Sequence, residues 1–196
     1  MSSSEKCHQC GWPFDSEALQ SNACKKCRRA IDRPAIQKII ICNAEILRHQ
    51  PGDPDALLNM GLCYLRLGLY DVAESFFGRL IDAQPEAASG YYYKAIGSMK
   101  GRRPRVMMLD DIRTAEQLLL TAMSLEPDNG RYDVVLAAMR HDYYVMNGLR
   151  VPEPRPGELL ERAQGKYLNH EEVALGLALM SIPEFFFGAA IFTGHI

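Results

Sequence analysis

Four cysteines near the N-terminus have the spacing of metal ligands. Cys7 and Cys10 form one Cys-x-x-Cys pair, and after thirteen intervening residues Cys24 and Cys27 form a second pair. Two residues between cysteines allow one turn to direct both thiolates at a single tetrahedral ion, and a second pair completes a site with four sulfur ligands. Because four thiolates leave no open position for water or substrate, we expect the ion to be a structural zinc.

The segment that carries these cysteines is too short to fold without a metal. Its apolar side chains are few, namely Trp12, Pro13, Phe14 and Leu19, so metal binding would drive its folding. The pattern resembles zinc-ribbon modules over about residues 5 to 29. A competing interpretation is thioredoxin-like redox chemistry, which usually places one Cys-x-x-Cys beside a strand and helix pattern that is missing here.

The composition of the whole chain is that of a globular protein. Of its 196 residues, 47% are hydrophobic and 23% are charged, close to the globular average. The formal net charge of −2 argues against a strongly electrostatic nucleic-acid binder, which needs a basic excess. The first six residues are polar and contain no apolar stretch typical of a secretory signal, so we expect a reducing, cytoplasmic location.

A repeat marked by proline organises the centre of the chain. Pro51 and Pro85 are 34 residues apart. The residues between them fit the pattern of two helices packed as a hairpin. The first helix carries Leu57, Met60, Gly61 and Tyr64, and the second carries Ala73, Phe77 and Leu80. Gly61 and Ala73 would let the helices approach closely, and Gly68 would supply the turn between them. In length and pattern this unit resembles the tetratricopeptide repeat (TPR).

The repeat continues on both sides of this unit. A helix is predicted over about 34 to 50, and a second hairpin consists of a helix over 87 to 99, a basic interruption over 100 to 105, and a helix that resumes near Asp111. Its second helix places Ala115, Leu119 and Ala122 before Pro127 as Ala73, Phe77 and Leu80 stand before Pro85. Further helices are expected at about 131–146, 158–168 and 170–181, with a proline-rich connector over 151–157.

The resemblance to TPR repeats extends over about residues 34 to 146. It implies a mostly α fold of TPR-like antiparallel helical hairpins, an α-solenoid, preceded by the small zinc ribbon. An irregular all-helical domain is the alternative, because apolar residues at helical spacing occur in every helical bundle. We divide the chain into a head (1–32), a TPR-like array (33–148), a connector (149–157) and C-terminal capping helices with a hydrophobic tail (158–196).

The C-terminal tail is unusually apolar from Val173 to Ile196 and allows several interpretations. We favour a capping helix that covers the open end of the array. A partner-docking surface is the next alternative, and burial within an assembly of subunits is another. Membrane insertion is disfavoured, because a span needs about 20 apolar residues and Pro183-Glu184 interrupts the stretch.

TPR proteins generally bind a peptide or a helix in a concave face lined by the first helix of each hairpin. The resemblance carries this face onto seven residues, namely Leu58, Leu62, Leu65, Arg66, Tyr92, Ile96 and Met99. Chaperone-binding members of the family hold a C-terminal carboxylate with Lys and Asn at such places. Here the places are mainly apolar, so a hydrophobic or helical protein segment is the expected ligand.

The sequence therefore indicates a non-enzymatic adaptor, scaffold or assembly factor for protein–protein interaction. No catalytic constellation is apparent, since the histidines are scattered and His170-Glu171-Glu172 lacks the spacing of a helical zinc-hydrolase motif. One alternative is a nucleic-acid-associated regulator whose zinc head and basic loop contact phosphate, through Lys100, Arg102, Arg103 and Arg105. Another is a scaffold attached to a membrane through the C-terminal tail.

Overall fold

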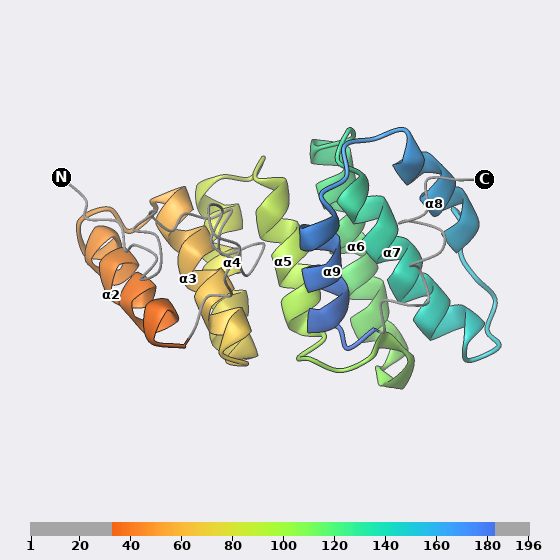
Figure 1. The fold of residues 1–196 in the computed structure, drawn as a ribbon, viewed down its shortest axis with the longest axis horizontal. Coiled ribbons are helices and arrows are strands. Elements are labelled where there is room, and N and C mark those ends of the chain that lie inside the picture. The colour runs from red at the N-terminus through yellow and green to blue at the C-terminus, as the bar shows by residue number, and fades with distance from the viewer. Residues whose placement is uncertain (1–32, 183–196) are drawn as a thin grey trace. The chain divides into compact units, whose positions relative to one another are not determined.

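The structure is a computed structural model, and it describes residues 33–182. The four cysteines Cys7, Cys10, Cys24 and Cys27 lie outside the described residues, as does the tail from 183 to 196. By packing, the chain separates into two compact units, Met1–Gly97 and Ser98–Ile196. Figure 1 gives the order of the helices along the chain.

The described part of the first unit consists of four helices. They are α2 (Arg33–His49), α3 (Pro54–Arg66), α4 (Tyr70–Ala83) and α5 (Ala88–Ser98), which ends at the unit boundary. These bounds confirm the helix predicted over 34–50, the hairpin between Pro51 and Pro85, and the helix over 87–99. Asp53 begins α3, because its side chain accepts a hydrogen bond from Ala56 N at 2.8 Å and Pro54 follows as the first helical residue.

Close contact between α3 and α4 depends on the glycine that the repeat pattern singled out. A Cβ atom at Gly61 would lie only 2.3 Å from Cε1 of Phe77, so the phenyl ring occupies the space that any other residue would fill. Ala73 and Phe77 are both fully buried. Gly68 has φ +74° in the turn between the two helices, a conformation that glycine adopts without strain.

Aromatic rings continue the core of this unit. Tyr64 stacks on Phe76 with ring centroids 5.5 Å apart, whereas Phe77 stacks on Tyr93 of α5 at 5.7 Å. On the other side, Asn59 of α3 donates a hydrogen bond to the Asn43 side chain of α2 at 3.2 Å. The unit is thus a set of antiparallel helices that meet through shape and aromatic contact.

The second unit surrounds one central helix. Its helices are η1 (Pro104–Val106), α6 (Leu109–Leu125), α7 (Gly130–Arg140), the π-helix η2 (His141–Val145), α8 (Pro156–Gln164) and α9 (His170–Leu179). These bounds confirm the predicted helices and the interruption at 100–105, where Lys100 and Gly101 have positive φ. Helix α8 differs from the prediction: it begins at Pro156, inside the expected connector, because the first turn of a helix accepts proline, and it ends at Gln164, before the expected 168. Helices α6, α8 and α9 and the π-helix all contact α7, and every residue of α7 is buried.

The predicted C-terminal helices pack on α7 through a short apolar seam. Leu159 and Ala163 of α8 are buried, as are Val173 and Leu177 of α9, with Met180 and Ile182 after it. Among the described residues one backbone bridge joins Asn129, just before α7, to Tyr167, which lies between α8 and α9. Among residues 33–182 no helix is long and apolar enough to cross a membrane.

Candidate protein-interaction surface

The apolar residues expected to line a partner groove are buried in the structure. Leu58, Leu62 and Leu65 of α3 are 8%, 1% and 1% exposed. Tyr92 and Ile96 of α5 are equally covered in the first unit, and Met99 is buried in the second. A ligand could contact these side chains only if whatever covers them moved aside, and their role in binding stays a prediction.

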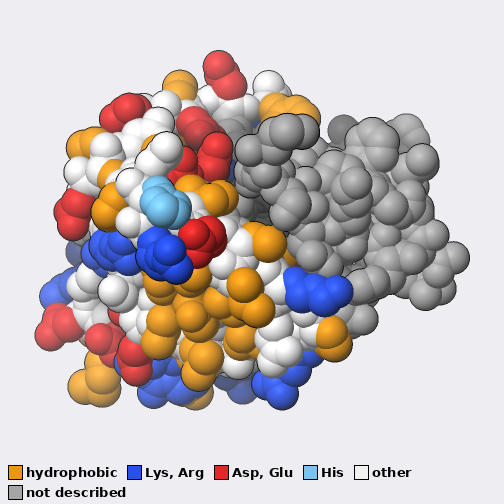
Figure 2. Space-filling view, turned by 90° about the vertical axis from the view of Figure 1, so that its left-hand side faces the viewer, with side chains coloured by type: hydrophobic (Ala, Val, Ile, Leu, Met, Phe, Trp, Pro, Cys, Tyr) orange, Lys and Arg blue, Asp and Glu red, His pale blue; other side chains and the backbone are white. Residues whose placement is uncertain are grey.

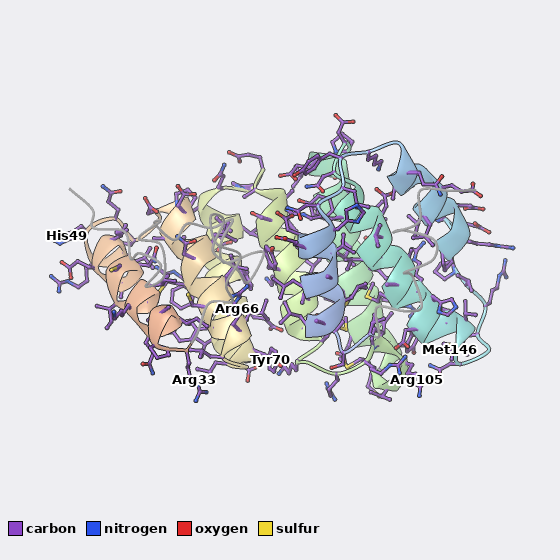
Figure 3. The ribbon with its side chains drawn as sticks, viewed as in Figure 1. Arg33, His49, Arg66, Tyr70, Arg105 and Met146 are labelled. Atoms are coloured by element: carbon purple, nitrogen blue, oxygen red, sulfur yellow. The ribbon has the colours of Figure 1, made fainter. Side chains whose placement is uncertain are left out.

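Arg66 is the one charged residue of that predicted set, and it is only partly exposed. Figure 3 labels it at the end of α3. Burial lowers the pKa of its guanidinium to about 10, with nearby Cys63 and Tyr93 opposing that shift. Burial also raises the pKa of the Cys63 thiol to about 12, so this cysteine is a protonated core residue and not a nucleophile.

One of the four basic residues of the loop, Arg103, has a structural role. Arg103 forms an ion pair with the buried carboxylate of Asp142, and Arg105 N donates a hydrogen bond to the same carboxylate at 3.1 Å. The side chains of Lys100, Arg102 and Arg105 are exposed. Arg103 therefore holds the loop against the π-helix, and contact of the basic loop with phosphate stays a prediction.

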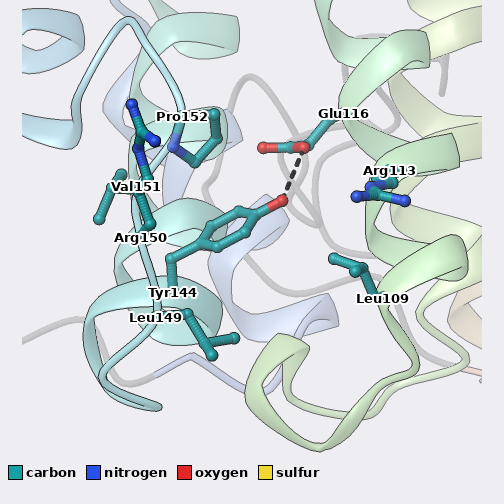
Figure 4. A pocket seen from close by; sticks show the side chains of 8 residues that line it. All are labelled: Leu109, Arg113, Glu116, Tyr144, Leu149, Arg150, Val151 and Pro152. Atoms are coloured by element: carbon teal, nitrogen blue, oxygen red, sulfur yellow. Dashed lines mark hydrogen bonds between the residues drawn. The ribbon is translucent and has the colours of Figure 1, made fainter.

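A pocket of about 450 Å³ opens in the second unit between α6 and the segment that follows the π-helix (Figure 4). Its wall on the α6 side carries Arg113 and Glu116, one turn apart, and Tyr144 of the π-helix points across the pocket toward Glu116. The remaining lining residues are Leu109, Leu149, Arg150, Val151 and Pro152. This volume lies in the range of sites that hold small ligands or the side chains of a partner.

The carboxylate in the pocket wall is neutralised from within the protein. Arg140 Nε lies 2.7 Å from Glu116 Oε1, and both side chains are more than 90% buried. The Tyr144 hydroxyl donates to Glu116 Oε2 at 3.1 Å, and Arg140 also donates to the carbonyl of Pro154 at 2.5 Å. Burial, and then the charge of Glu116, raise the pKa of the Tyr144 hydroxyl to about 12. This cluster is a structural anchor that fixes the connector against α6 and α7.

Exposed apolar side chains border the pocket. They come from residues 106–109 and 145–149, two segments joined where Asn147 donates a hydrogen bond to Arg105 O at 3.0 Å. Figure 3 shows Arg105 and Met146 near each other at this place. We call these six side chains the apolar rim: Val106, Met108, Leu109, Val145, Met146 and Leu149, which are 37% to 74% exposed. Apolar residues concentrated beside a pocket are typical of a protein-interaction site.

Sequence reasoning did not find the apolar rim or the pocket. Residues 106–109 fall in an insertion relative to the repeat, and 145–149 fall where a predicted helix ends, so neither segment has a periodicity to interpret. The available signal was the pair of exposed methionines, Met108 and Met146, next to segments rich in arginine. Flexible methionine side chains are common on surfaces that adapt to partners.

A second apolar surface lies on α2 in the first unit. Figure 2 shows hydrophobic side chains gathered on the side of the molecule where α2 lies. Ile41 is 69% exposed there, and Ala44 one turn later is exposed too. Beside this surface the Glu45 carboxylate pairs with Arg48 at 3.0 Å and lies within hydrogen-bond distance of His49 Nε2 at 3.1 Å.

Solved structures share this arrangement of helices. A double mutant of MamA (RS-1, ArsTM) superposes with a TM-score of 0.52 at 16% sequence identity, covering 66% of this chain and 65% of that one. A mutant of the Thermobaculum terrenum O-GlcNAc transferase superposes with a TM-score of 0.54 at 21% identity, covering 76% of this chain and 26% of that one. The fold is TPR-like.

The likeness to these structures extends to the fold alone. Both matches are less than 25% identical, and each spans less than two thirds of the other protein's length. No protein-family model and no curated protein sequence matches the chain. Residues 33–182 contain no group of three or more His, Cys, Asp or Glu side chains arranged to hold a metal ion, and the zinc prediction rests on residues outside this range.

Proposed function

We propose that the chain is a non-enzymatic adaptor or assembly factor of the cytoplasm that binds an apolar or helical segment of another protein. The observation that carries the proposal is the apolar rim beside the pocket, in a unit of a TPR-like fold. The rim exposes large apolar side chains, and their burial against a partner would be favourable. The covered state of Leu58, Leu62 and Leu65 makes the second unit the better candidate for the first contact with a partner.

The test is affinity capture with the full chain from a native lysate, followed by binding of each candidate in purified form. We expect a protein partner whose affinity for the full chain falls with salt much less steeply than binding to phosphates does, because apolar contact is weakly screened. Substitution of Leu149 and Met146 by Ser should weaken that binding without unfolding the unit. If only nucleic acid co-purifies, and its binding falls steeply with salt, the regulator alternative replaces the adaptor.

We also propose that the N-terminal head binds one structural zinc ion through Cys7, Cys10, Cys24 and Cys27. The support is the spacing of the cysteine pairs, which matches closed four-sulfur sites. Elemental analysis of the full chain, purified without chelator, should find one zinc per chain, and Cys24→Ser with Cys27→Ser should abolish it. Cys42→Ser is the matched control and should leave the zinc content unchanged. A metal-free wild-type protein would contradict the proposal.

A further inference from the structure

The charges around the pocket in the second unit are unequal. Two of its lining residues, Arg113 and Arg150, are exposed cations. Arg113 approaches Asp110 only at 3.8 Å, and both of those side chains are largely in solvent, at 64% and 95% exposure. Arg150 forms no ion pair with any other residue among 33–182. An exposed contact such as that between Arg113 and Asp110 contributes little, so both guanidinium groups remain available to a ligand.

The one acidic lining residue does not offset these cations. Glu116 is paired with Arg140 at 2.7 Å and also accepts a hydrogen bond from Tyr144. Its charge is therefore cancelled by a third, buried arginine that does not belong to the pocket lining. The pocket lining thus presents two positive charges and no unpaired negative charge, an arrangement complementary to a carboxylate. Asp110 lies outside the lining, and its carboxylate is 95% exposed to solvent.

Apolar groups lie between these cations and around them. Leu109 and Leu149 belong both to the pocket lining and to the apolar rim, and Val151 adds to the lining. The surface is concave here, with a volume of about 450 Å³. A hollow of this kind accepts a projecting side chain, whereas a flat lipid surface would contact only side chains that project from the protein.

From this combination we propose that the pocket and apolar rim bind a protein segment in which an apolar anchor is flanked by Asp or Glu. The anchor fills the space between Leu109, Leu149 and Val151, and the acidic side chains pair with Arg113 and Arg150. This inference rests on the proposed adaptor function and names the chemistry of its partner. Arginine is suited to the role, because its planar guanidinium binds a carboxylate through two parallel hydrogen bonds.

The experiment is a selection from a displayed library of random short peptides on the full chain, followed by fluorescence polarisation with the enriched sequences. We expect a consensus of one large apolar residue with neighbouring acidic residues. Arg113→Glu/Arg150→Glu should weaken binding by about tenfold to a hundredfold, since each exposed ion pair contributes modestly and the reversed charges repel the acidic side chains. Lysine in place of the acidic residues of the peptide should have a similar effect on the wild-type chain.

The matched control is Arg33→Glu/Arg48→Glu, which makes the same change in net charge on exposed residues of α2 in the other unit. It should leave peptide binding unchanged. Leu149→Ser, a substitution of an exposed residue, removes the apolar contact without reversing a charge and should weaken binding as well. Circular dichroism of each variant verifies that the chain remains folded.

Several results would overturn the inference. Enriched peptides that are basic or neutral, or that bind the double variant normally, would leave an adaptor that uses another surface. Enrichment of no peptide would remove the proposed ligand class. Tighter, pocket-dependent binding of phosphatidylserine vesicles or of a single-stranded RNA oligonucleotide would assign the arginines to phosphate and would count against the adaptor too. Concentration-dependent dimerisation lost in the double variant would make a second copy the occupant.

Discussion

Different kinds of interaction stabilise the interior of each of the two units. Between residues 33 and 97 the helices meet through apolar shape, with Phe77 seated on Gly61 and stacked on Tyr93. Between residues 98 and 182 the central helix α7 and the π-helix after it carry four buried ions, each paired with a different element of the unit. They are Arg131 with Glu172, Asp133 with Lys166 and Arg162, Arg140 with Glu116, and Asp142 with Arg103.

One repeat-like fold therefore specifies the contacts between its helices by two physical means. Apolar contacts set how closely helices approach, and they tolerate substitution when volume is kept. Buried ion pairs add little net stability compared with apolar residues of the same size, yet loss of one partner is costly. We therefore expect the second unit to be the more sensitive to removal of single charges and the first to be the more sensitive to added volume.

The largest effect should come from Asp133→Ala in the second unit. The carboxylate is fully buried, 2.5 Å from Lys166 Nζ and 3.3 Å from Arg162 Nη2. Its removal leaves the partly covered Lys166 ammonium without its counter-ion, and we expect a loss of about 3–5 kcal/mol in the free energy of unfolding. Denaturant titration measures the loss, and hydrogen exchange should localise it to residues 98–182. Asp128→Ala, at an exposed position nearby, is the control and should cost less than about 0.5 kcal/mol.

Gly61→Ala tests the opposite expectation in the first unit. The added methyl group would meet the Phe77 ring at 2.3 Å, so the ring or the helix must move, at a cost of about 1–3 kcal/mol. Gly78→Ala is the matched control, since its nearest neighbour would be the flexible end of Lys94 at 3.8 Å. That control should be neutral or stabilising by up to about 1 kcal/mol. Equal losses for the two variants would refute the shape-based account.

Gly68→Ala should have a smaller effect than Gly61→Ala. No atom lies within 4 Å of the added carbon, so the cost arises only from the backbone, which has φ +74°. A left-handed conformation costs an alanine about 1–2 kcal/mol. Gly157→Ala is the comparison, because that position also has open space but an ordinary φ, and thermal unfolding should show no loss there.

The smallest effect concerns the pocket wall at high pH. The pKa of Tyr144 is raised to about 12 from an ordinary value of 10, so the stability that its protonated hydroxyl contributes is present below pH 10 and lost as pH rises toward 12. Tyr144→Phe should cost roughly 1 kcal/mol near neutral pH, and its deficit relative to wild type should shrink across that window. If the stability difference between Tyr144→Phe and the wild type stayed constant with pH, the hydrogen bond from the Tyr144 hydroxyl to Glu116 would not be its source.

The sequence predicted the first unit at the level of single residues. Gly61, Gly68, Ala73 and Phe77 were identified by the repeat pattern, and the structure confirms their contacts because helix pairing of this kind depends on residue size. The pattern did not indicate which aromatic rings stack on each other: Tyr64 stacks on Phe76, and Phe77 stacks on Tyr93. Adjacent aromatic residues on one helix differ only in direction, and residue type alone does not encode that direction.

In the second unit the sequence predicted the helices but few of the contacts between them. The bounds of α6 to α9 follow from prolines, glycines and helical spacing. The ion pairs join residues up to 41 positions apart, and periodicity carries no information on which charge meets which. For this reason the alternative that assigns the basic loop to phosphate contact included Arg103, which is an internal partner of Asp142. The pocket is lined by residues of α6 and of the segment from Tyr144 to Pro152, and periodicity does not indicate that these two segments meet.

The charge-bearing central helix also limits how the chain can be shortened. Arg131 has its counter-ion in α9 and Asp133 has its counter-ions in and just after α8, so a fragment that ends before Glu172 retains one of these ions without its complement. A fragment that begins after Arg103 strands Asp142 in the same way. Expression of the C-terminal half should therefore begin at Ser98 and extend through Ile182, and internal insertions belong outside the stretches that supply these partners.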